Sequence, residues 1–296
     1  MALSGRLVKD IAEAIGGATG QPFAPARQES AGGGCINQAH TLLGQDGRRF
    51  FLKLNGADKA DMFAAEAEGL AELAASGAIR VPRAIAHGIS EASAWLVLEY
   101  LALGGRGSGA DLGTRLAALH RTTQGTFGWH RDNTIGATHQ PNDPCANWMD
   151  FYRVRRLKFQ LDLARRNGAG RRLLENGERL MSDLQAFFSD YVPVPSLLHG
   201  DLWGGNFAYA DGEPVLFDPA VYYGDREADL AMTALFGGFP GDFYAAYEEA
   251  WPLDPGYGVR KTLYNLYHII NHFNLFGGGY GAQAEEMSAR LLAEIR

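Results

Sequence analysis

The spacing of apolar and polar residues predicts that the chain begins with a mixture of helices and strands. An amphipathic helix is expected over residues 4–16, followed by a glycine-rich turn over residues 32–34. A second helix is expected over residues 58–76, where one apolar stripe ends at Gly77, and a strand over residues 95–101. The first part of the chain therefore combines strands with at least two helices.

Another strand is predicted around a lysine. Phe50, Leu52 and Leu54 alternate there with Phe51 and Lys53. Because successive side chains of a strand point to opposite faces, Lys53 should point away from the face that Leu52 and Leu54 bury. A charged group is thus expected in the middle of a strand.

The rest of the chain is predicted to be mainly helical. Glycines and a serine in series over residues 104–109 disfavour regular structure, so we place a boundary between a lobe of residues 1–103 and a larger lobe of residues 104–296. The helices expected in the larger lobe cover residues 112–120, 148–164, 171–188, 228–235, 242–250, 257–276 and 282–295. The one exception is a hairpin of residues 206–210 and 213–218, joined by the turn-forming pair Asp211-Gly212.

Composition excludes several classes of protein. Lys plus Arg number 27 against 34 Asp plus Glu, a formal charge of -7, so nucleic acid is not an expected partner. The basic stretch of residues 153–172 carries apolar residues at helical spacing and is interpreted as a solvated helix face. Asp10 and Glu13 interrupt the first helix, and no run of about 18 apolar residues occurs, so we expect a cytoplasmic protein without membrane partners. Two cysteines allow neither a disulfide framework nor a zinc cluster.

The segment of residues 198–207, L-H-G-D-L-W-G-G-N-F, matches the kinase catalytic-loop pattern H-R-D-L-x-x-x-N except at the arginine. In that pattern the aspartate is the catalytic base and the asparagine binds a metal ion, which assigns these roles to Asp201 and Asn206. An isolated His-Gly-Asp is commonly just a turn. Here four positions agree with the pattern and a hairpin follows.

The hairpin adds a second acidic group. Pairing across Asp211-Gly212 sets Asn206 roughly opposite Phe217, so the Asn206 amide and the Asp218 carboxylate are expected side by side. Such a pair suits Mg²⁺, which takes one or two protein oxygens and completes its shell with phosphate and water. Asp201 would then accept the proton of a substrate hydroxyl that attacks the γ-phosphate of ATP.

The first lobe supplies the partners that this loop needs. Lys53 follows the glycine-rich segment, as a phosphate-binding lysine should. Two glutamates of the next helix, Glu66 and Glu68, are candidates for its ion-pair partner. Glu66 falls on the apolar stripe of that helix, whereas Glu68 is rotated about 200° away. We therefore predict that Glu66 orients Lys53 and that Glu68 is a solvated charge.

The glycines Gly32, Gly33 and Gly34 lie between an entering strand and the Lys53 strand, where their backbone N–H groups can approach ATP phosphates. Cys35 follows them and has two interpretations. It is either a small residue that fills a turn or an exposed thiol that oxidises and links two chains.

Residues at the end of the last strand, Glu99, Tyr100 and Leu101, stand just before the glycine linker. A kinase-like fold offers adenine its backbone hydrogen bonds at this position. A buried strand end is compatible with the same assignment, because the main chain matters more here than the side chains.

Several segments resemble the fructosamine-3-kinase or ketosamine-3-kinase family, which is related to aminoglycoside phosphotransferases and choline kinases. The resemblance covers nearly the whole chain, and it is carried by residues 33–39, 127–130 with 132–136, 199–206, 218–220 with 223–229, and 264–268 through 276–280.

The resemblance implies an α+β, bilobal, protein-kinase-like fold, with ATP phosphates bound by the first lobe and with the catalytic loop, metal and acceptor in the second. It implies ATP- and Mg²⁺-dependent phosphorylation of the C3 hydroxyl of ketosamines, a deglycation activity. Asp201 then looks like the base, Lys53 like the phosphate-binding lysine, and Asn206 and Asp218 like the metal ligands. Trp203 looks like a substrate-side wall, although packing of the loop explains it nearly as well.

Other polar residues are weaker candidates for the acceptor side of the site: His199, Trp129, Asp229, His268 and Asn271. For Trp129, loop packing is an equally good interpretation. His268 and His272 have the spacing of two zinc ligands, but the glutamate of the zinc motif H-E-x-x-H is absent, so a packed or substrate-facing helix is favoured.

Two departures from protein kinases favour a small acceptor. Gly200 replaces the arginine that precedes Asp201, and residues 219–228 are too few for a peptide-docking activation loop. Two further hypotheses stay open: a related kinase with an aminoglycoside, choline or homoserine-like acceptor, and a pseudokinase scaffold. The sequence does not decide the preferred sugar, a free or protein-bound acceptor, or whether the chain is a monomer or a dimer.

Overall fold

The computed structural model describes residues 3–32 and 36–295, and it divides into two compact units. The first unit comprises Met1–Gly107 and Ala208–Asp218, and the second comprises Ser108–Phe207 and Pro219–Arg296. From the sequence, the hairpin after Asn206 is expected in the lobe of residues 104–296. In the structure the hairpin belongs to the first unit, where the backbone N–H of Leu216 donates to the carbonyl of Arg80 at 3.0 Å.

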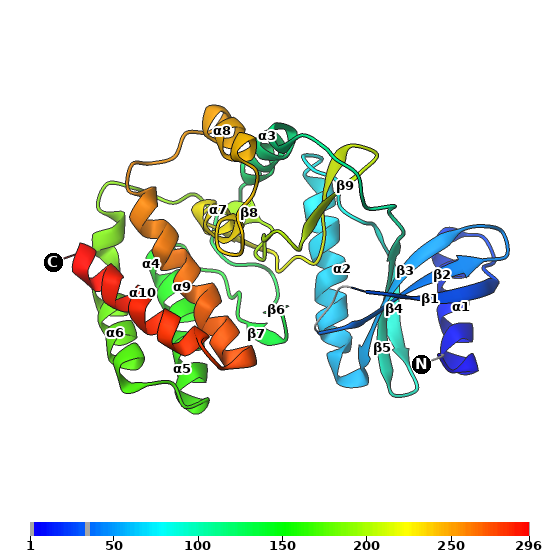
Figure 1. The fold of residues 1–296 in the computed structure, drawn as a ribbon. Helices are drawn as coiled ribbons and strands as arrows, with labels where there is room; N and C mark the ends of the chain where they lie inside the picture. Colours follow the sequence, from blue (N-terminus) through cyan, green and yellow to red (C-terminus); the bar gives the residue numbers. More distant parts are fainter. Residues whose placement is uncertain (1–2, 33–35, 296) are drawn as a thin grey trace. The chain divides into compact units, whose positions relative to one another are not determined.

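A five-stranded antiparallel sheet forms the first unit, with the strand order β1-β2-β3-β5-β4 (Figure 1). Its strands are β1 (Pro25–Ala31), β2 (Gln38–Gly44), β3 (Arg49–Gly56), β4 (Ala84–Ser90) and β5 (Ser93–Glu99). The predicted strands around Lys53 and Trp95 are confirmed as β3 and β5. Because β3 lies in the middle of the sheet, Lys53 is held by ladders on both sides, opposite Ala39 of β2 and Leu96 of β5.

Helix α1 (Gly5–Thr19) covers one face of this sheet. Its first turn is capped by Ser4, whose hydroxyl accepts the backbone N–H of Leu7 at 3.1 Å. The buried side of the helix packs on the strands in one apolar cluster that includes Leu7, Ile11, Ile15, Leu42, Leu52, Leu54 and Val97. The face that carries Leu52 and Leu54 is therefore the α1 face.

Helix α2 (Ala60–Ala75) lies on the other side of the sheet and follows the short 3-10 helix η1 (Ala57–Lys59) (Figure 1). Phe63, Leu70 and Leu73 are buried on its inner face, as the predicted stripe requires. Glu68 is exposed. Lys53 therefore points to the helix that carries Glu66.

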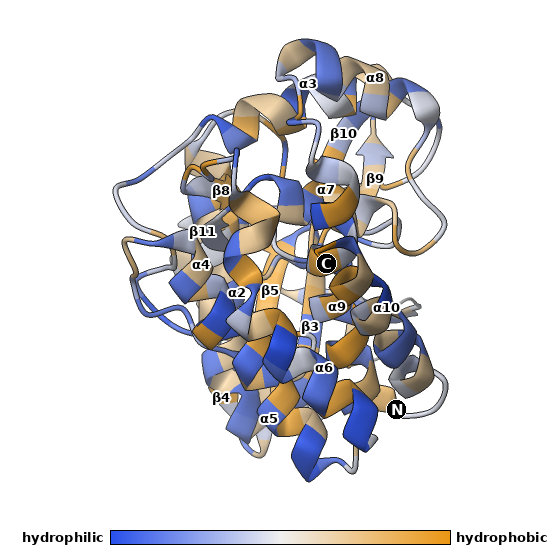
Figure 2. Cartoon of the chain, turned by 90° about the vertical axis from the view of Figure 1, so that its left-hand side faces the viewer, coloured by the Kyte–Doolittle hydropathy of each residue, from blue (hydrophilic) through white to orange (hydrophobic). Residues whose placement is uncertain are grey.

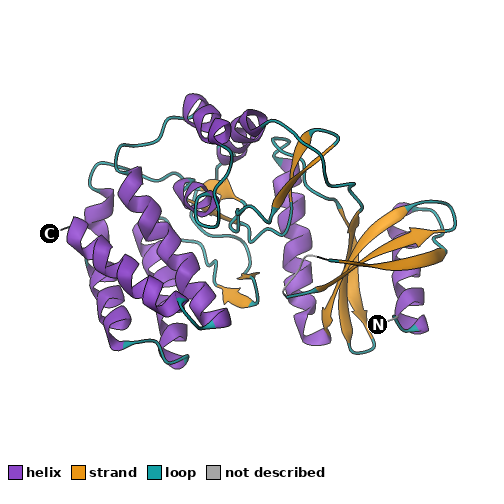
Figure 3. Ribbon diagram, in the orientation of Figure 1, coloured by secondary structure: helices purple, strands orange, loops and turns teal. Residues whose placement is uncertain are grey.

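The second unit is mainly helical (Figure 3). Its elements are α3 (Gly109–His120), α4 (Trp148–Phe151), the π-helix η2 (Tyr152–Lys158), α5 (Phe159–Arg166), α6 (Arg171–Ser182), the 3-10 helix η3 (Leu184–Phe188), α7 (Glu227–Thr233), α8 (Gly241–Ala250), α9 (Tyr257–Phe276) and α10 (Tyr280–Glu294). Helix α9 packs against α10, α7 and α5, and α3 packs against α8. Figure 2 shows hydrophilic and hydrophobic segments alternating along α5, α6 and α10, as expected of helices with one buried face.

Two short strand pairs in the second unit were not predicted. One pairs β6 (Asn133–Ile135) with β7 (Thr138–Gln140), and the other pairs β8 (Ser196–Leu198) with β11 (Tyr222–Gly224). The expectation that the hairpin is the only exception to helix is therefore wrong. Strands of three residues, of which β8 and β11 are buried throughout, give no alternating pattern. Among the described residues, no helix combines the length and apolar composition needed to cross a membrane.

Candidate active site

The predicted catalytic loop starts where strand β8 ends. Leu197 and Leu198 are fully buried, and β8 pairs with β11, so the loop leaves the core from a fixed point. The carbonyl of His199 then accepts the backbone N–H of Ala220 at 2.8 Å, which ties the start of the loop to the segment before β11. His199 itself is fully buried, and the N–H of Asp201 donates to its Nδ1 at 3.3 Å.

Asp229 holds the backbone of this loop. It lies in the first turn of α7, is 2% exposed, and its two oxygens accept the N–H groups of His199 and Gly200 at 2.7 and 2.8 Å. The Nε2 atom of His120 lies 3.2 Å from the same carboxylate. Burial alone would raise the pKa of Asp229, but hydrogen bonds and charge from His120, with the Gly200 N–H, hold this pKa below its usual value. The structure shows the Asp229 carboxylate on the loop backbone, and its predicted place on the acceptor side stays a prediction.

The glycine that replaces the kinase arginine is required by the backbone. Gly200 has φ +83, a left-handed conformation that L side chains rarely adopt. A Cβ atom at this position would lie 2.0 Å from the carbonyl oxygen of Ala220. The loop therefore passes so close to the neighbouring segment that only glycine fits.

Within the second unit, Asp201 and Asn206 are in direct contact. The Asn206 amide nitrogen donates to the backbone oxygen of Asp201 at 2.9 Å and to its carboxylate at 3.2 Å. Asn206 is 6% exposed, and its N–H bonds the carbonyl of Trp203. Since the nitrogen of the amide is used by the loop, its oxygen is the atom suited to bind a cation.

Within the first unit, Lys53 stands between two carboxylates. Its Nζ atom lies 2.5 Å from Glu66 Oε1 on α2 and 2.6 Å from Asp218 Oδ1 at the end of the hairpin. Burial alone would lower the pKa of Lys53, but the charges of Asp218 and Glu66 raise it, so the ammonium stays charged although Lys53 is 5% exposed. The predicted Lys53–Glu66 pair is confirmed, and its part in nucleotide binding stays a prediction.

The hairpin that brings Asp218 to Lys53 consists of β9 (Phe207–Ala210) and β10 (Glu213–Leu216). Its turn residues Asp211 and Gly212 both have positive φ, at 52° and 84°, as a two-residue hairpin turn requires. Asp218 also has a positive φ, 57°, which is uncommon for a residue with a side chain. Such a backbone persists where the surroundings hold it, and it is frequent at functional sites.

The remaining nucleotide-binding candidates are only partly described. Gly32 is exposed after β1, whereas Gly33, Gly34 and Cys35 lie outside the described residues. After them, Asn55 of β3 donates to the Asn37 side chain at 2.7 Å, which anchors the start of β2.

Strand β5 ends at Glu99, whose N–H donates to the carbonyl of Arg83 at 2.8 Å. The Glu99 carboxylate lies 3.4 Å from Arg80. Tyr100 and Leu101 follow outside the strand, and the backbone N–H of Leu103 bonds the Leu101 carbonyl. Adenine binding by residues 99–101 stays a prediction.

The acceptor-side candidates separate into exposed and packed residues. Trp203 is 38% exposed, whereas Trp129, His268 and Asn271 are 3%, 5% and 2% exposed. Asn271 accepts a hydrogen bond from Gln160 at 3.1 Å, so it joins α9 to α5. Trp129 packs edge-on against His130, which favours the loop-packing interpretation.

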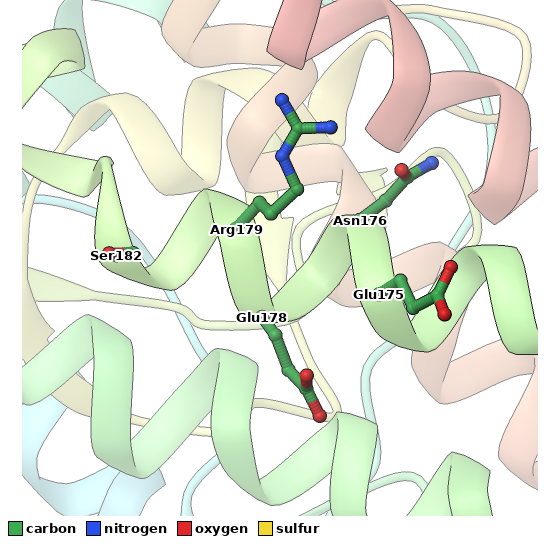
Figure 4. Close-up of a pocket in the computed structure, with 5 residues that line it drawn as sticks. All are labelled: Glu175, Asn176, Glu178, Arg179 and Ser182. Carbon is green, nitrogen blue, oxygen red and sulfur yellow. The ribbon is translucent and has the colours of Figure 1, made fainter.

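One open surface depression lies on α6 (Figure 4). It is lined by Glu175, Asn176, Glu178, Arg179 and Ser182, whose side chains project from one helix in different directions. Glu175 pairs with Arg171, and Glu178 with Arg165. None of the predicted catalytic or binding residues lines this depression.

The sheet, helix α2, the predicted catalytic loop and the hairpin follow one another along the chain, and the class of fold is that of the aminoglycoside phosphotransferases. Two solved aminoglycoside phosphotransferases share the fold over 100% and 98% of this chain and 96% and 99% of theirs. Their TM-scores are 0.63 and 0.65 at 14% and 13% identity. More specifically, the profile of the fructosamine kinase family matches residues 7–294, and the chain belongs to this family.

Individual relatives agree with the family. A probable ketoamine kinase of Synechocystis is 50% identical over 287 residues, which cover 95% of this chain and 96% of the relative. The chloroplastic protein-ribulosamine 3-kinase of Arabidopsis thaliana is 42% identical over 260 residues, 86% of this chain and 79% of that protein. The crystal structure of a Haemophilus somnus protein proposed to be a fructosamine-3-kinase has a TM-score of 0.88 at 29% identity, covering 95% of this chain and 96% of that one.

Proposed function

We propose that the chain is an ATP-dependent ketosamine 3-kinase, which transfers the γ-phosphate of ATP to the C3 hydroxyl of a ketosamine. The observation that carries the proposal is family membership over nearly the whole chain, with relatives named ketoamine kinase and protein-ribulosamine 3-kinase at 50% and 42% identity. The catalytic loop and the buried lysine pair give this assignment its chemistry.

Asp201 is proposed as the general base. Its carboxylate is half-buried and is held by the Asn206 amide, on a loop whose backbone Asp229 fixes. In this position Asp201 accepts the proton of the acceptor hydroxyl as the hydroxyl oxygen attacks phosphorus. The loop needs no phosphorylation to be ordered, because its anchors are buried hydrogen bonds.

Asn206 and Asp218 are proposed as ligands of Mg²⁺, which when bound offsets charge on the phosphate oxygens. The donor set fits this ion, since one amide oxygen and one carboxylate leave room for phosphate and water oxygens. The carboxylate of Asp218 is 47% exposed, so it is accessible to a ligand.

Lys53 is proposed to bind the phosphates of ATP, oriented by Glu66. A buried ammonium that stays charged provides a strong donor to phosphate, and the helix-borne carboxylate keeps its long side chain in one position. Phosphorylation at C3 destabilises the sugar–amine adduct, and the activity therefore releases the amine from its sugar.

An acceptor panel tests the proposal. The full chain is incubated with ATP and Mg²⁺ and, one at a time, ribulosamine, fructosamine, an aminoglycoside, choline and homoserine, and ADP formation is measured. We expect turnover with a ketosamine that Asp201→Asn abolishes. Turnover with the aminoglycoside alone would replace ketosamine by another acceptor, and nucleotide binding without any turnover would favour a pseudokinase.

A further inference from the structure

Three side-chain amides are buried together in the second unit. They belong to Asn133 at the start of β6, Gln140 at the end of β7 and Asn142 just after β7, and these residues are 8%, 1% and 0% exposed. Asn133 lies in residues 132–136, one of the segments that carry the family resemblance, and the chemistry proposed above gives this segment no role. Because a buried amide is costly unless it is hydrogen-bonded, the partners of these side chains indicate what they do.

Asn133 and Gln140 bind the backbone of the segment that follows Asp218 in the chain. The amide nitrogen of Asn133 donates to the carbonyl of Val221 at 2.7 Å, and that of Gln140 donates to the carbonyl of Ala220 at 3.2 Å. Ala220 and Val221 are themselves 2% and 1% exposed. Two consecutive buried carbonyls are thus satisfied by side chains of the β6–β7 pair.

The same backbone segment contacts the start of the catalytic loop. The Ala220 N–H donates to the carbonyl of His199 at 2.8 Å. The Ala220 carbonyl oxygen comes so close to Gly200 that a Cβ atom there would lie 2.0 Å from it. A shift of Ala220 would therefore displace the two residues that precede Asp201. The β6–β7 pair is connected to the catalytic loop through this one residue.

The orientation of the Gln140 amide is fixed by its partners. Both of its hydrogens are used, one by the Ala220 carbonyl and the other by Asn133 Oδ1 at 2.8 Å. Its oxygen accepts the hydroxyl of Tyr267 at 2.7 Å. Since a backbone carbonyl cannot donate, turning this amide over would place its oxygen against the Ala220 oxygen. Gln140 therefore holds Ala220 in one geometry.

Arg156 fixes the third amide. Its guanidinium has no acceptor atom and donates from Nη2 to Asn142 Oδ1 at 2.7 Å, so the Asn142 nitrogen points to Asn133 Oδ1, at 2.9 Å. Arg156 is fully buried on the π-helix η2, and its bonds within the described residues include no carboxylate. Its charge is stabilised by the Pro141 carbonyl, at 2.6 Å, and by the Tyr222 ring, whose centroid lies 4.0 Å from Cζ. Segments of π-helix are frequent at functional sites, and this one supplies the cation that anchors the amides.

The choice of amides at these positions indicates more than packing. Apolar side chains of similar size would join β6 and β7 to the core without the cost of burying polar groups. Hydrogen bonds are directional, so a fully connected buried network specifies one geometry, which apolar packing does not. The backbone that this network fixes is the one that contacts the catalytic loop.

We propose that Asn133 and Gln140 are positioning residues of the catalytic loop. They hold the backbone of Ala220 and Val221, and Ala220 in turn fixes the residues before Asp201, so that its carboxylate reaches the acceptor hydroxyl. The proposal rests on the function proposed above and adds two residues that act on the reaction through Ala220.

Two variants weaken the network to different degrees. Gln140→Met keeps the length of the side chain and removes every hydrogen bond of the amide, whereas Tyr267→Phe removes only the hydroxyl that donates to Gln140. Asn176→Leu is the control. Asn176 is a half-buried amide that joins α6 to α10 through the Ser288 hydroxyl, at 3.1 Å, and it lies outside the network.

Each full-length variant is measured in two ways. The first is kcat with ATP, Mg²⁺ and ribulosamine, expressed per nucleotide-binding site, with the sites counted by calorimetric titration with ADP. This count removes the contribution of unfolded protein. The second is backbone hydrogen exchange of the unliganded chain, followed by mass spectrometry.

For Gln140→Met we expect kcat per site to fall by about 10- to 100-fold with KM for ATP unchanged, because a small displacement of a catalytic group is costly. Tyr267→Phe should show the same pattern at about 2- to 10-fold, the effect of one hydrogen bond. In both variants exchange should become faster over residues 199–201 and 220–222 and stay at the wild-type rate in α6 and α10. Asn176→Leu should give the reverse, with wild-type kcat and faster exchange only in α6 and α10.

Exchange that rises equally throughout the second unit, or a kcat per site equal to that of the wild type, would overturn the proposal, because the amides would then only stabilise the fold. If Gln140→Met does not fold, Tyr267→Phe supplies both measurements. If the wild type transfers phosphate to no ketosamine, the proposed function fails, whereas locally faster exchange in the variants still supports the connection between the network and the loop.

Discussion

Two regions hold the residues assigned to catalysis, and they stabilise their buried charges in different ways. In the first unit, Lys53 is neutralised by two carboxylates, Glu66 and Asp218. In the second unit, the Asp229 carboxylate is held by two backbone N–H groups and the ring of His120. One region pairs a charge with two opposite charges, and the other binds a carboxylate with backbone N–H dipoles and a histidine ring.

The difference determines what each region can do. A lysine between carboxylates keeps its charge for an incoming phosphate, and its partners lie on α2 and on the end of a hairpin. A carboxylate that binds backbone N–H groups instead fixes the path of a loop. The first arrangement therefore suits ligand binding, and the second suits the positioning of Asp201.

Asp201→Asn should reduce activity the most, because it removes the proposed base and keeps the side-chain shape. We expect kcat to fall by about 10²- to 10⁴-fold, the usual contribution of general base catalysis, with the dissociation constant of ATP unchanged. ADP formation and equilibrium nucleotide binding are the two measurements. Residual activity above a tenth of wild type would exclude Asp201 as the base.

Asp229→Ala tests the region in which the Asp229 carboxylate holds the backbone of the catalytic loop. The substitution leaves two buried N–H groups without their acceptor, so we expect a loss of about 3–5 kcal/mol in the free energy of unfolding, measured with urea. We also expect kcat to fall while KM for ATP stays near wild type, because the Lys53 region is untouched. Asp229→Asn keeps the shape and one acceptor oxygen, and it should lose less. A selective rise in KM for ATP would contradict the division of roles.

Glu66→Gln tests the charge-paired region. Loss of one charge from a buried pair should lower stability by about 1–3 kcal/mol and raise KM for ATP, because Lys53 is oriented less well. Glu68→Gln on the same helix is the matched control, since Glu68 is exposed, and it should stay within about 0.5 kcal/mol of wild type. Similar effects of the two substitutions would remove the special role of Glu66.

The two regions were not equally accessible to sequence analysis. Glu66 could be selected because helix geometry is local and one stripe decides which of two glutamates faces the sheet. Helix α9 was predicted with its observed bounds, Tyr257–Phe276, since its apolar pattern is long and glycines flank it. Asp201 and Asn206 came from a motif, which fixes residue types but no contacts.

Asp229 could not be assigned in the same way. Its contacts with His199 and Gly200 join residues about thirty positions apart through α7 and the β8–β11 pair. The three-residue strands of that pair carry no periodic pattern, so their arrangement was not predictable from spacing.

The pH dependence of stability is a smaller effect that also distinguishes the Asp229 region from the Lys53 region. The pKa of Asp229 is lowered in the folded state, so its stabilising contribution is complete above the unfolded value of about 4 and is lost as pH falls through the folded value. The stability difference between wild type and Asp229→Asn should therefore be constant from pH 7 to 5 and shrink below about pH 4. Urea unfolding at each pH measures it. A difference that grows on acidification would contradict the assigned charge state.

The position of the phosphate on the product shows whether Asp201 directs the γ-phosphate of ATP to the C3 hydroxyl of a ketosamine. Wild-type and Asp201→Asn proteins are incubated with ATP, Mg²⁺ and ribulosamine, and the product is analysed by phosphorus–proton correlation NMR. We expect a wild-type product with phosphorus coupled to the C3 proton, and no such product from the variant. Phosphate on another hydroxyl, or the same product from Asp201→Asn, would contradict it.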